Sequence, residues 1–357
     1  MSGDVQLTTY FAERDRAGGR YLADALLDVY ERHGVRLSVL LRGIEGFGTR
    51  HRLRSGQLET AALDLPIVAI AVDGRDRIRT VLPEVLRLSG HGLVTLEGVR
   101  TASGPVVPPG EAGGEVKLTL YCGRGERAGG VPAFVALVEL LHRAGLTGAT
   151  VLLGVDGTAG GRRHRATFLS HNRSVPVMIV AVGSSAGIAG ALAGLGQLPV
   201  RPVTTLERVL VCKRDGEVLA APERLGHEGP PRWQKLMVYA SEATLVGGLP
   251  LHAQLLRRLL GAGAAGASTL RGIWGFHGDH PPHGDRPLSL RRHVPTVTTV
   301  VDTPDRIQRW FAIADAVTTE TGLVTCETVP ALQARDPRAR GPEPDPDWDG
   351  PPAPPRR

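Results

Sequence analysis

The sequence predicts an α+β protein made of three tandem copies of one small domain. An eight-residue block occurs three times: it reads LRGIEGFG at 41–48, LLGVDGTA at 152–159 and LRGIWGFH at 270–277, at spacings of 111 and 118 residues. Tyr10, Tyr121 and Tyr239 keep the same register. A repeat of about 100 residues is too long for a solenoid unit and long enough for a whole domain.

The first copy predicts the element order β-α-β-β-α-β. Alternating apolar residues at 5–11 indicate a strand, and apolar residues at helical spacing over 22–30 indicate a helix that ends near Gly34. A second strand at 37–41 leads into a polar loop at 46–63, and the apolar run at 66–72 is the third strand. Asp73 is expected to cap a second helix over 78–86, and 93–96 forms the fourth strand. This is the ferredoxin-like plan, in which both helices cover one face of an antiparallel sheet.

The third strands indicate how the copies are arranged. Residues 67–72 and 177–182 are continuously apolar, whereas a strand with one solvent-exposed face should alternate. We therefore expect the second face of each sheet to be covered by the sheets of the other two copies. The Gly/Pro-rich stretches at 101–115 and 214–233 are long enough to join domains packed around a common axis. The alternative is three separate domains that each pair with other chains.

Composition excludes several classes of protein. Aromatic residues make up only 4% of the 357 residues, so the cores must consist of Leu, Val, Ala and Ile, which suits several small domains. The sequence shows no signal peptide and no run of 18 apolar residues, so we expect a soluble, cytoplasmic protein that is not embedded in a membrane. Cys122, Cys212 and Cys326 lack the spacing of a zinc site or a disulfide framework.

The formal net charge of +6 has two interpretations. Abundant Arg with scarce Lys, which occurs only at 117, 213 and 235, is typical of a GC-rich genome. The alternative is attraction to phosphates or acidic partners. No basic run is interleaved with aromatic residues, so we predict no nucleic-acid partner.

Several motifs together resemble a known family. In the first copy they read YFAE at 10–13, LRGIEGFG at 41–48, DLPIV at 64–68 and GLVTLE at 92–97. The third copy matches through Tyr239, Glu242, LRGIWGF at 270–276, VP at 294–295 and GLVT at 322–325. This set resembles the PII-like family known as domain of unknown function 190. The second copy is divergent but keeps the skeleton, with TLE at 205–207 near its end.

The resemblance implies a trimer of ferredoxin-like subunits with inward-facing sheets. It also implies small ligands, such as adenine nucleotides, in the clefts between subunits, and a loop after strand two that docks on a transporter or an enzyme. Here the subunits lie in one chain, so we predict a monomeric, single-chain PII-like pseudo-trimer. Its parts are repeat 1 at 1–100, a linker at 101–115, a divergent repeat 2 at 116–213, a linker at 214–233, repeat 3 at 234–332 and a Pro-rich, disordered tail at 333–357.

The candidate ligand-binding residues lie where strand two opens into the loop. Arg42 and Arg271 offer planar guanidinium groups that suit phosphate or carboxylate, and the neighbouring glycines let backbone N–H groups approach a ligand. Glu13 and Glu242, just after strand one, could bind the ligand or pair with these arginines across a cleft. The alternative for the arginines is a structural contact that holds the neighbouring subunit or the loop in place, and the alternative for the glutamates is a surface charge near a helix start. The full candidate set is Glu13, Arg42, Gly43, Gly46, Phe47, Gly48, Glu242, Arg271, Gly272, Gly275 and Phe276.

Repeat 2 departs from this pattern at two positions. It has Leu153 in place of the arginine and Thr158 in place of the phenylalanine. We therefore expect repeats 1 and 3 to keep the ligand-facing residues and repeat 2 mainly to complete the architecture.

Other motifs carry weaker chemistry. His277, His280 and His283 have a spacing that a metal site could use, but a solvated loop stiffened by Pro281-Pro282 is the simpler interpretation, so we predict no metal and no cofactor. GSSAG at 183–187 matches a nucleophile elbow but falls at an expected helix start, where serine is a capping residue. No catalytic set recurs in all copies, so we predict that the protein is not an enzyme.

The resulting prediction is a PII-like signalling or regulatory protein. It binds a small anionic ligand, such as an adenine nucleotide, in inter-repeat clefts and contacts its target through the loops after strand two. The alternatives are a ligand-free protein-interaction scaffold and an enzyme of small-molecule turnover.

Overall fold

Three units of the same topology make up this α+β chain. The computed structural model describes residues 3–48, 51–55, 64–90, 92–101, 114–166, 174–223, 232–278, 280–284 and 294–333. In repeat 1 the elements are β1 (Asp4–Ala12), α1 (Leu22–Arg32), β4 (Leu37–Arg42), β7 (Pro66–Gly74), α2 (Arg75–Leu88) and β8 (Leu93–Thr101). The antiparallel strands lie side by side as β8-β1-β7-β4. The predicted element order β-α-β-β-α-β is therefore present.

Repeats 2 and 3 have the same strand order. Repeat 2 contains β9 (Glu115–Gly123), α3 (Ala133–Arg143), β12 (Gly148–Ala159), β14 (Pro176–Ser184), α4 (Ser185–Leu195) and β15 (Val203–Arg208). Repeat 3 contains β18 (Arg232–Ser241), α5 (Leu251–Gly261), β21 (Ala267–Arg271), β24 (Pro295–Asp302), α6 (Pro304–Asp315) and β25 (Leu323–Gln333). Their sheets run β15-β9-β14-β12 and β25-β18-β24-β21.

Short strands and hairpins are added to the three four-stranded sheets. Three of the hairpins turn on the Gly-Gly pairs and join β2 (Arg16–Ala17) to β3 (Arg20–Tyr21), β10 (Arg127–Ala128) to β11 (Val131–Pro132), and β19 (Leu245–Val246) to β20 (Leu249–Pro250). The remaining short strands are β5 (Glu45–Phe47), β6 (Arg54–Ser55), β13 (Arg162–Arg163), β16 (Leu210–Arg214), β17 (Glu217–Val218), β22 (Trp274–His277) and β23 (His283–Gly284). β16 begins within repeat 2, and its hairpin partner β17 falls in the stretch expected to be the second linker; the described residues of the tail end at 333.

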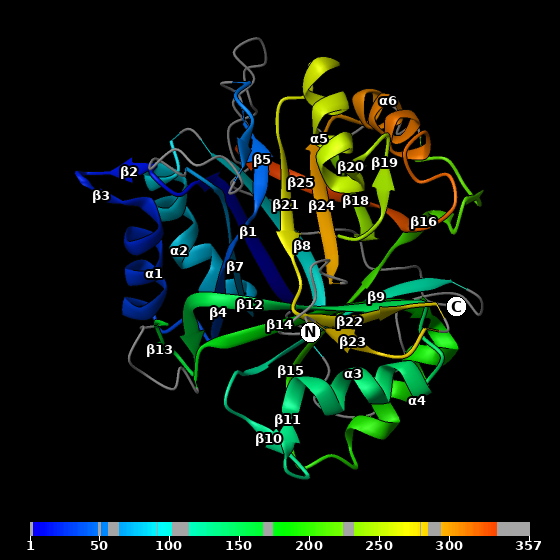
Figure 1. The fold of residues 1–357 in the computed structure, drawn as a ribbon. Coiled ribbons are helices and arrows are strands. Elements are labelled where there is room, and N and C mark those ends of the chain that lie inside the picture. Colours follow the sequence, from blue (N-terminus) through cyan, green and yellow to red (C-terminus); the bar gives the residue numbers. More distant parts are fainter. Residues whose placement is uncertain are drawn as a thin grey trace, which may run out of the picture.

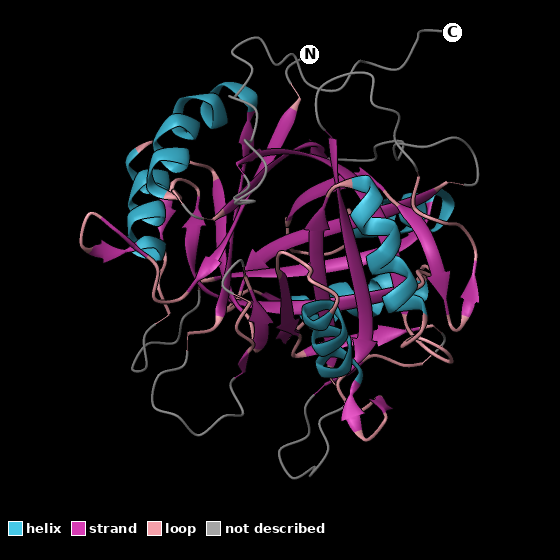
Figure 2. Cartoon of the chain, turned by 90° about the horizontal axis from the view of Figure 1, so that it is seen from above, coloured by secondary structure: helices cyan, strands magenta, loops and turns pink. Residues whose placement is uncertain are grey.

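The helices lie on the outside and the sheets face inward (Figures 1 and 2). Each helix pair covers its own apolar cluster, as with Leu26 and Tyr30 of α1, which are fully buried against β1 and β7. The expected cap of α2 is wrong. Gly74 is the N-cap, and Asp73 instead accepts a hydrogen bond from the Arg36 backbone N–H at 2.7 Å, which ties the end of β7 to the start of β4.

The inner faces of the three sheets share one core. It includes Val68 and Val72 of repeat 1, Val180 of repeat 2, and Leu270 and Val297 of repeat 3. The third strands are therefore buried on both faces, which confirms the expectation drawn from their continuously apolar sequence. Apart from the three Gly-Gly hairpins, the described strands of all three repeats belong to one sheet of 19 strands.

The repeats exchange strands in a closed cycle. The segment after strand two of each repeat pairs with strand two of another: β5 of repeat 1 pairs with β21 of repeat 3, β22 of repeat 3 pairs with β12 of repeat 2, and the second half of β12 pairs with β4 of repeat 1. The fourth strands, together with β16, which follows β15, link the repeats in the opposite sense, as β8 to β15, β16 to β25, and β25 to β8. The polar loops expected to begin at 46 therefore begin with an inter-repeat strand.

Candidate functional site

The repeated eight-residue block forms the exchanged strands. A Cβ atom on Gly46 would lie 2.6 Å from the Ala267 carbonyl oxygen of repeat 3, and one on Gly275 would lie 2.2 Å from the Ala149 carbonyl oxygen of repeat 2. Gly43 and Gly272 are similarly crowded, whereas Gly48 has open space around it. Four of the five candidate glycines thus lie where a neighbouring strand or a proline ring leaves no room for a Cβ atom.

The candidate phenylalanines are core residues of the neighbouring repeat. Phe47 of repeat 1 is buried in the core of repeat 3, and Phe276 of repeat 3 is buried in the core of repeat 2. Thr158 takes the same place in repeat 1, where its hydroxyl donates to the Val35 carbonyl oxygen at 3.0 Å and lies 3.0 Å from Ser38 Oγ. In the divergent copy, a hydrogen-bonded threonine therefore occupies the position that a buried phenylalanine has in the other two copies.

The candidate arginines are paired with the candidate glutamates. Arg42 donates from Nε and Nη2 to the two carboxylate oxygens of Glu13 at 2.8 and 3.0 Å, and Arg271 pairs with Glu242. Both pairs lie within one repeat, so the expected pairing across a cleft is not what the structure has. These guanidinium groups are neutralised locally and line neither of two clefts that lie between repeats.

Cleft A lies between repeats 1 and 2 and encloses about 570 Å³. Arg36 and Arg201 bring positive charge to its wall, which also contains His164 and the acidic residue Glu126. Arg36 Nη2 pairs with Asp4 at 3.1 Å, while its buried Nε has no hydrogen-bond partner among the described residues. Arg201 donates from Nη1 to two backbone carbonyl oxygens. Cleft A is therefore a concave site with positive groups.

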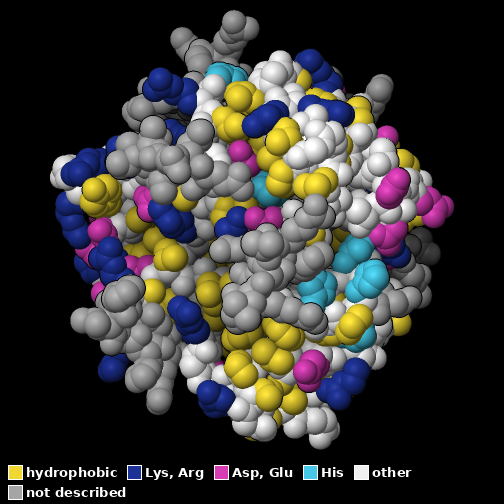
Figure 3. Space-filling model, in the orientation of Figure 1, with side chains coloured by type: hydrophobic (Ala, Val, Ile, Leu, Met, Phe, Trp, Pro, Cys, Tyr) yellow, Lys and Arg dark blue, Asp and Glu magenta, His cyan; other side chains and the backbone are white. Residues whose placement is uncertain are grey.

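Cleft B occupies the corresponding position between repeats 2 and 3 and encloses about 290 Å³. Tyr239 stands where cleft A has Tyr121, and both clefts contain the proline that opens strand three. Its wall includes Phe276 and the three histidines of the loop, in a region where histidine side chains gather on the surface (Figure 3). Of the candidate set, only Gly275 and Phe276 line either cleft.

The three histidines line cleft B without converging. His277 Nε2 lies 2.5 Å from Asp215 Oδ1, and His283 Nδ1 lies 3.1 Å from the Pro281 carbonyl oxygen. Among the described residues, the only group of three His, Cys, Asp or Glu side chains close enough to share a metal ion lies elsewhere, at Glu97, Glu207 and Glu327.

The GSSAG motif is a helix start. Ser184 is the N-cap of α4 and its hydroxyl accepts a hydrogen bond from the Gly187 N–H at 3.1 Å, while the Ser185 hydroxyl donates to the Gly114 carbonyl oxygen. The capping role expected for this motif is confirmed.

A buried charge cluster at the centre of the molecule did not figure among the candidates. It consists of Glu97, Glu207 and Glu327 with Lys117 and Lys235, all less than 10% exposed. The signal was present in the sequence, because the three glutamates follow the same threonine by two positions and the two lysines share one register position of strand one.

A known protein family matches most of the chain. The family model of domain of unknown function 190, described as uncharacterized ACR, COG1993, matches residues 4–101, 115–211 and 233–331. The chain belongs to this family. It carries three tandem copies of the domain, as the sequence motifs predicted.

Individual relatives add little detail. A UPF0166 protein of Aquifex aeolicus (strain VF5) is 31% identical over 67 residues, which cover 19% of this chain and 70% of that protein. Among solved structures, a point mutant of the ferredoxin protease FusC in complex with Arabidopsis ferredoxin aligns with 88% of this chain at 8% identity and a TM-score of 0.17; the chain spans 62% of its length. This likeness supports no argument about fold or function. In the described residues, no helix is both long and apolar enough to cross a membrane.

Proposed function

We propose that this protein is a single-chain PII-like regulator in which three ferredoxin-like repeats take the place of three subunits. Cleft A binds a small anionic ligand, such as an adenine nucleotide, and the segments that follow strand two contact a protein target. The observation that carries the proposal is a cleft at an inter-repeat boundary, of a volume typical of ligand sites, whose wall holds two arginines and one histidine against one acidic side chain.

The proposed contacts differ from those expected from the sequence. Arg42 already makes two hydrogen bonds to Glu13, so binding an anion there would require breaking a bidentate ion pair. Arg201 is bound only to backbone carbonyl oxygens in the hydrogen bonds described, and these leave its positive charge available to a ligand. Repeat 2 therefore supplies most of the proposed site instead of merely completing the architecture.

Ligand occupancy at this boundary would couple to the exchanged strands. Ala159 and Gly160, at the end of the strand that repeat 2 lends to repeat 1, belong to the wall of cleft A. A ligand in cleft A would contact the end of this exchanged strand. If it binds one conformation of the strand end more tightly than another, it shifts the population of the two, which is the requirement for a regulatory response.

Calorimetry of the full chain with ATP, ADP, AMP, cyclic AMP and inorganic phosphate tests the proposal. We expect at least one nucleotide to bind, and Arg201→Ala to weaken it by about tenfold or more because a charge-assisted contact is lost. Arg208→Ala, an exposed arginine of the same repeat outside the cleft, should leave the affinity unchanged. No binding of any of these ligands, or equal affinity in both variants, would reject cleft A as the site.

An interaction scaffold is the second candidate, and one observation favours it. Each Gly-Gly hairpin exposes a large apolar side chain, namely Tyr21, Val131 and Leu245 at 46%, 41% and 50% exposure. The three hairpins lie well apart from one another in the molecule (Figure 1). Under this alternative, the triple variant with serine at these positions loses capture of a protein partner while calorimetry finds no small ligand for the wild-type chain.

A further inference from the structure

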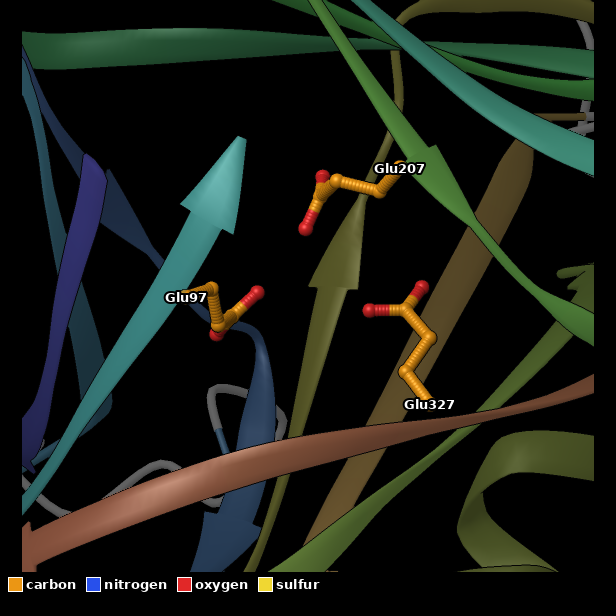
Figure 4. Close-up of side chains that lie close together, drawn as sticks. All are labelled: Glu97, Glu207 and Glu327. Carbon is orange, nitrogen blue, oxygen red and sulfur yellow. The ribbon is translucent and has the colours of Figure 1, made fainter. Parts of the chain in front are cut away.

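Three carboxylates meet where the three repeats join. Glu97, Glu207 and Glu327 occupy the same register position of the fourth strands and point toward one another (Figure 4). Their ligand oxygens lie within 4.8 Å of one another, and each residue is at most 8% exposed. Three negative charges this close and this buried require compensation.

The three carboxylates form a triangle, and each pair of them is called an edge here. Two lysines place a positive charge on two of the three edges. Lys117 Nζ lies 3.0 Å from Glu207 and 2.7 Å from Glu327, and Lys235 Nζ lies 2.9 Å from Glu327 and 2.7 Å from Glu97. Each ammonium group therefore bridges two carboxylates that belong to different repeats. Only the edge between Glu97 and Glu207 has no ammonium group of its own.

Gln6 stands at this third edge. It has the register position in β1 that Lys117 has in β9 and Lys235 in β18. Its amide Nε2 donates to Glu97 at 3.2 Å, and its Oε1 accepts from the Tyr121 hydroxyl at 3.3 Å. The amide is neutral, so the cluster holds three carboxylates against two ammonium groups. Fully ionised, it would keep one uncompensated negative charge in the interior.

Glu207 is the least compensated of the three carboxylates. Glu327 has two ammonium neighbours, and Glu97 has one ammonium group as well as hydrogen bonds from Gln6 and from the Thr95 hydroxyl. Glu207 has Lys117 alone: its Oε2 lies 3.0 Å from Lys117 Nζ, but this contact lacks hydrogen-bond geometry, and Oε2 makes no hydrogen bond with any other described residue.

We propose that the edge between Glu97 and Glu207 is a buried proton-binding site, in which one exchangeable proton replaces the lysine that Gln6 lacks and joins repeat 1 to repeat 2. The proton sits on Glu207 and is donated to the Glu97 carboxylate. The cluster is then electrically neutral, with a positive bridge or a proton on every edge.

The acid–base properties of the two carboxyl groups agree with this placement. Burial raises the pKa of Glu207 to about 7, against the opposing charge of Lys117 and with the help of Glu327 and Glu97. Burial also acts to raise the pKa of Glu97, but Lys235, Lys117 and hydrogen bonds from Lys235 and Glu207 outweigh it and lower that pKa to about 2. The other ionisable groups facing the cluster are the phenols of Tyr10, Tyr121 and Tyr239, whose pKa values burial raises, so they stay neutral.

A metal ion fits this cluster less well than a proton. A divalent cation added to three carboxylates and two ammonium groups would leave an excess positive charge, whereas one proton brings the total to zero. The ammonium groups also already lie at hydrogen-bond distance from the oxygens that would have to bind the metal.

The proton makes the contact at the centre depend on pH near neutrality. Glu207 has a higher pKa in the folded chain than the value near 4.5 of the unfolded chain, so its contribution to stability is fully present below about pH 4.5 and is lost as pH rises through about 7. Above that pH the folded chain retains an unbalanced charge where the three repeats meet.

Infrared spectroscopy and denaturation of the full chain test the proposal. The wild-type chain should show the absorption of a buried protonated carboxyl group at pH 6 that disappears with a midpoint near 7, and both Glu207→Gln and Gln6→Lys should abolish it. Relative to Glu207→Gln, the unfolding equilibrium constant of the wild type should rise about tenfold from pH 6 to pH 8. Gln6→Lys is the sharper variant, because lysine already fits this register position in repeats 2 and 3.

Three results would overturn the proposal. One is the absence of the carboxyl absorption in the wild type at pH 6. Another is its persistence in Glu207→Gln. The third is calcium or magnesium retained by the wild type after dialysis and released by Glu207→Gln. If Glu207→Gln fails to fold, the wild-type titration and Gln6→Lys still decide the question.

Discussion

Gly275→Ala separates a packing role of the repeated glycines from a ligand-binding role. The added Cβ would lie 2.2 Å from the Ala149 carbonyl oxygen, whereas ordinary contact begins at 3.4 Å, so β22 must withdraw from β12 by about 1.2 Å. The four residue pairs that join these strands, Trp274–His277 with Gly148–Val151, hold repeat 3 to repeat 2. The same shift would pull Phe276 from the core of repeat 2.

The expected loss of stability follows from these two effects. Overpacking a filled site costs about 1–3 kcal/mol, and each weakened backbone hydrogen bond costs about 1 kcal/mol net. We therefore expect Gly275→Ala to lower the free energy of unfolding by about 2–4 kcal/mol in urea denaturation. Gly48→Ala is the matched control: it lies at the end of the block in repeat 1 with nothing within 4 Å, and should change stability by less than about 0.5 kcal/mol.

The opposite pattern would refute the packing role. If these glycines serve mainly to let backbone N–H groups approach a ligand, Gly275→Ala would weaken ligand binding and leave the denaturation midpoint equal to that of Gly48→Ala. Equal midpoints for the two variants would therefore show that Gly275 is not needed for the contact between β22 and β12.

Three further predictions concern the contacts between repeats and the state of the chain. The Arg163 side chain of repeat 2 is 15% exposed and pairs with Asp24 and Asp28 of α1, so Arg163→Ala should lower the free energy of unfolding by about 1–3 kcal/mol in urea denaturation. The Arg165 side chain is 62% exposed, so Arg165→Ala should lower it by less than about 0.5 kcal/mol. Burial, aided by the charge of Arg271, lowers the pKa of His252 to about 4. Its contribution is therefore complete above about pH 6.5 and decreases as pH falls: measured relative to His252→Asn, so that the opposite pH dependence of Glu207 cancels, the wild type should lose about 2 kcal/mol between pH 7.5 and 5. Light scattering should give a monomer near 37.9 kDa, because the strand exchange closes within one chain; a threefold mass would contradict this.

The elements of each repeat were predictable because they depend on local pattern. Leu26 and Tyr30 are spaced to face one sheet from a helix, and the continuous apolar run at 67–72 required cover on both faces. The exchanged strands were not predictable in this way. Gly46 and Phe47 look like the start of a loop, since their partners, Ser268 and Ala267, lie more than 200 residues away and belong to another copy.

The same limit explains the displaced candidate site. Arg42 and Glu13 are 29 residues apart, and nothing in their spacing shows that they satisfy each other and leave cleft A to Arg36 and Arg201. The three lysines show how a compositional interpretation can miss a structural role. Their scarcity is typical of a GC-rich genome, yet all three are at most 4% exposed and two of them lie in the central cluster.

Fusion of three copies into one chain is what permits this asymmetry. In a trimer of identical subunits, a Lys-to-Gln change in strand one would appear three times and leave three buried carboxylates without any ammonium group. In one chain the change occurs once, at Gln6, and a single proton on Glu207 is enough to restore neutrality. Thr158 likewise replaces phenylalanine in one exchanged strand only, and Arg201 of cleft A has Thr321 at its register position in cleft B. Each boundary between repeats can therefore acquire its own chemistry while the common fold is retained.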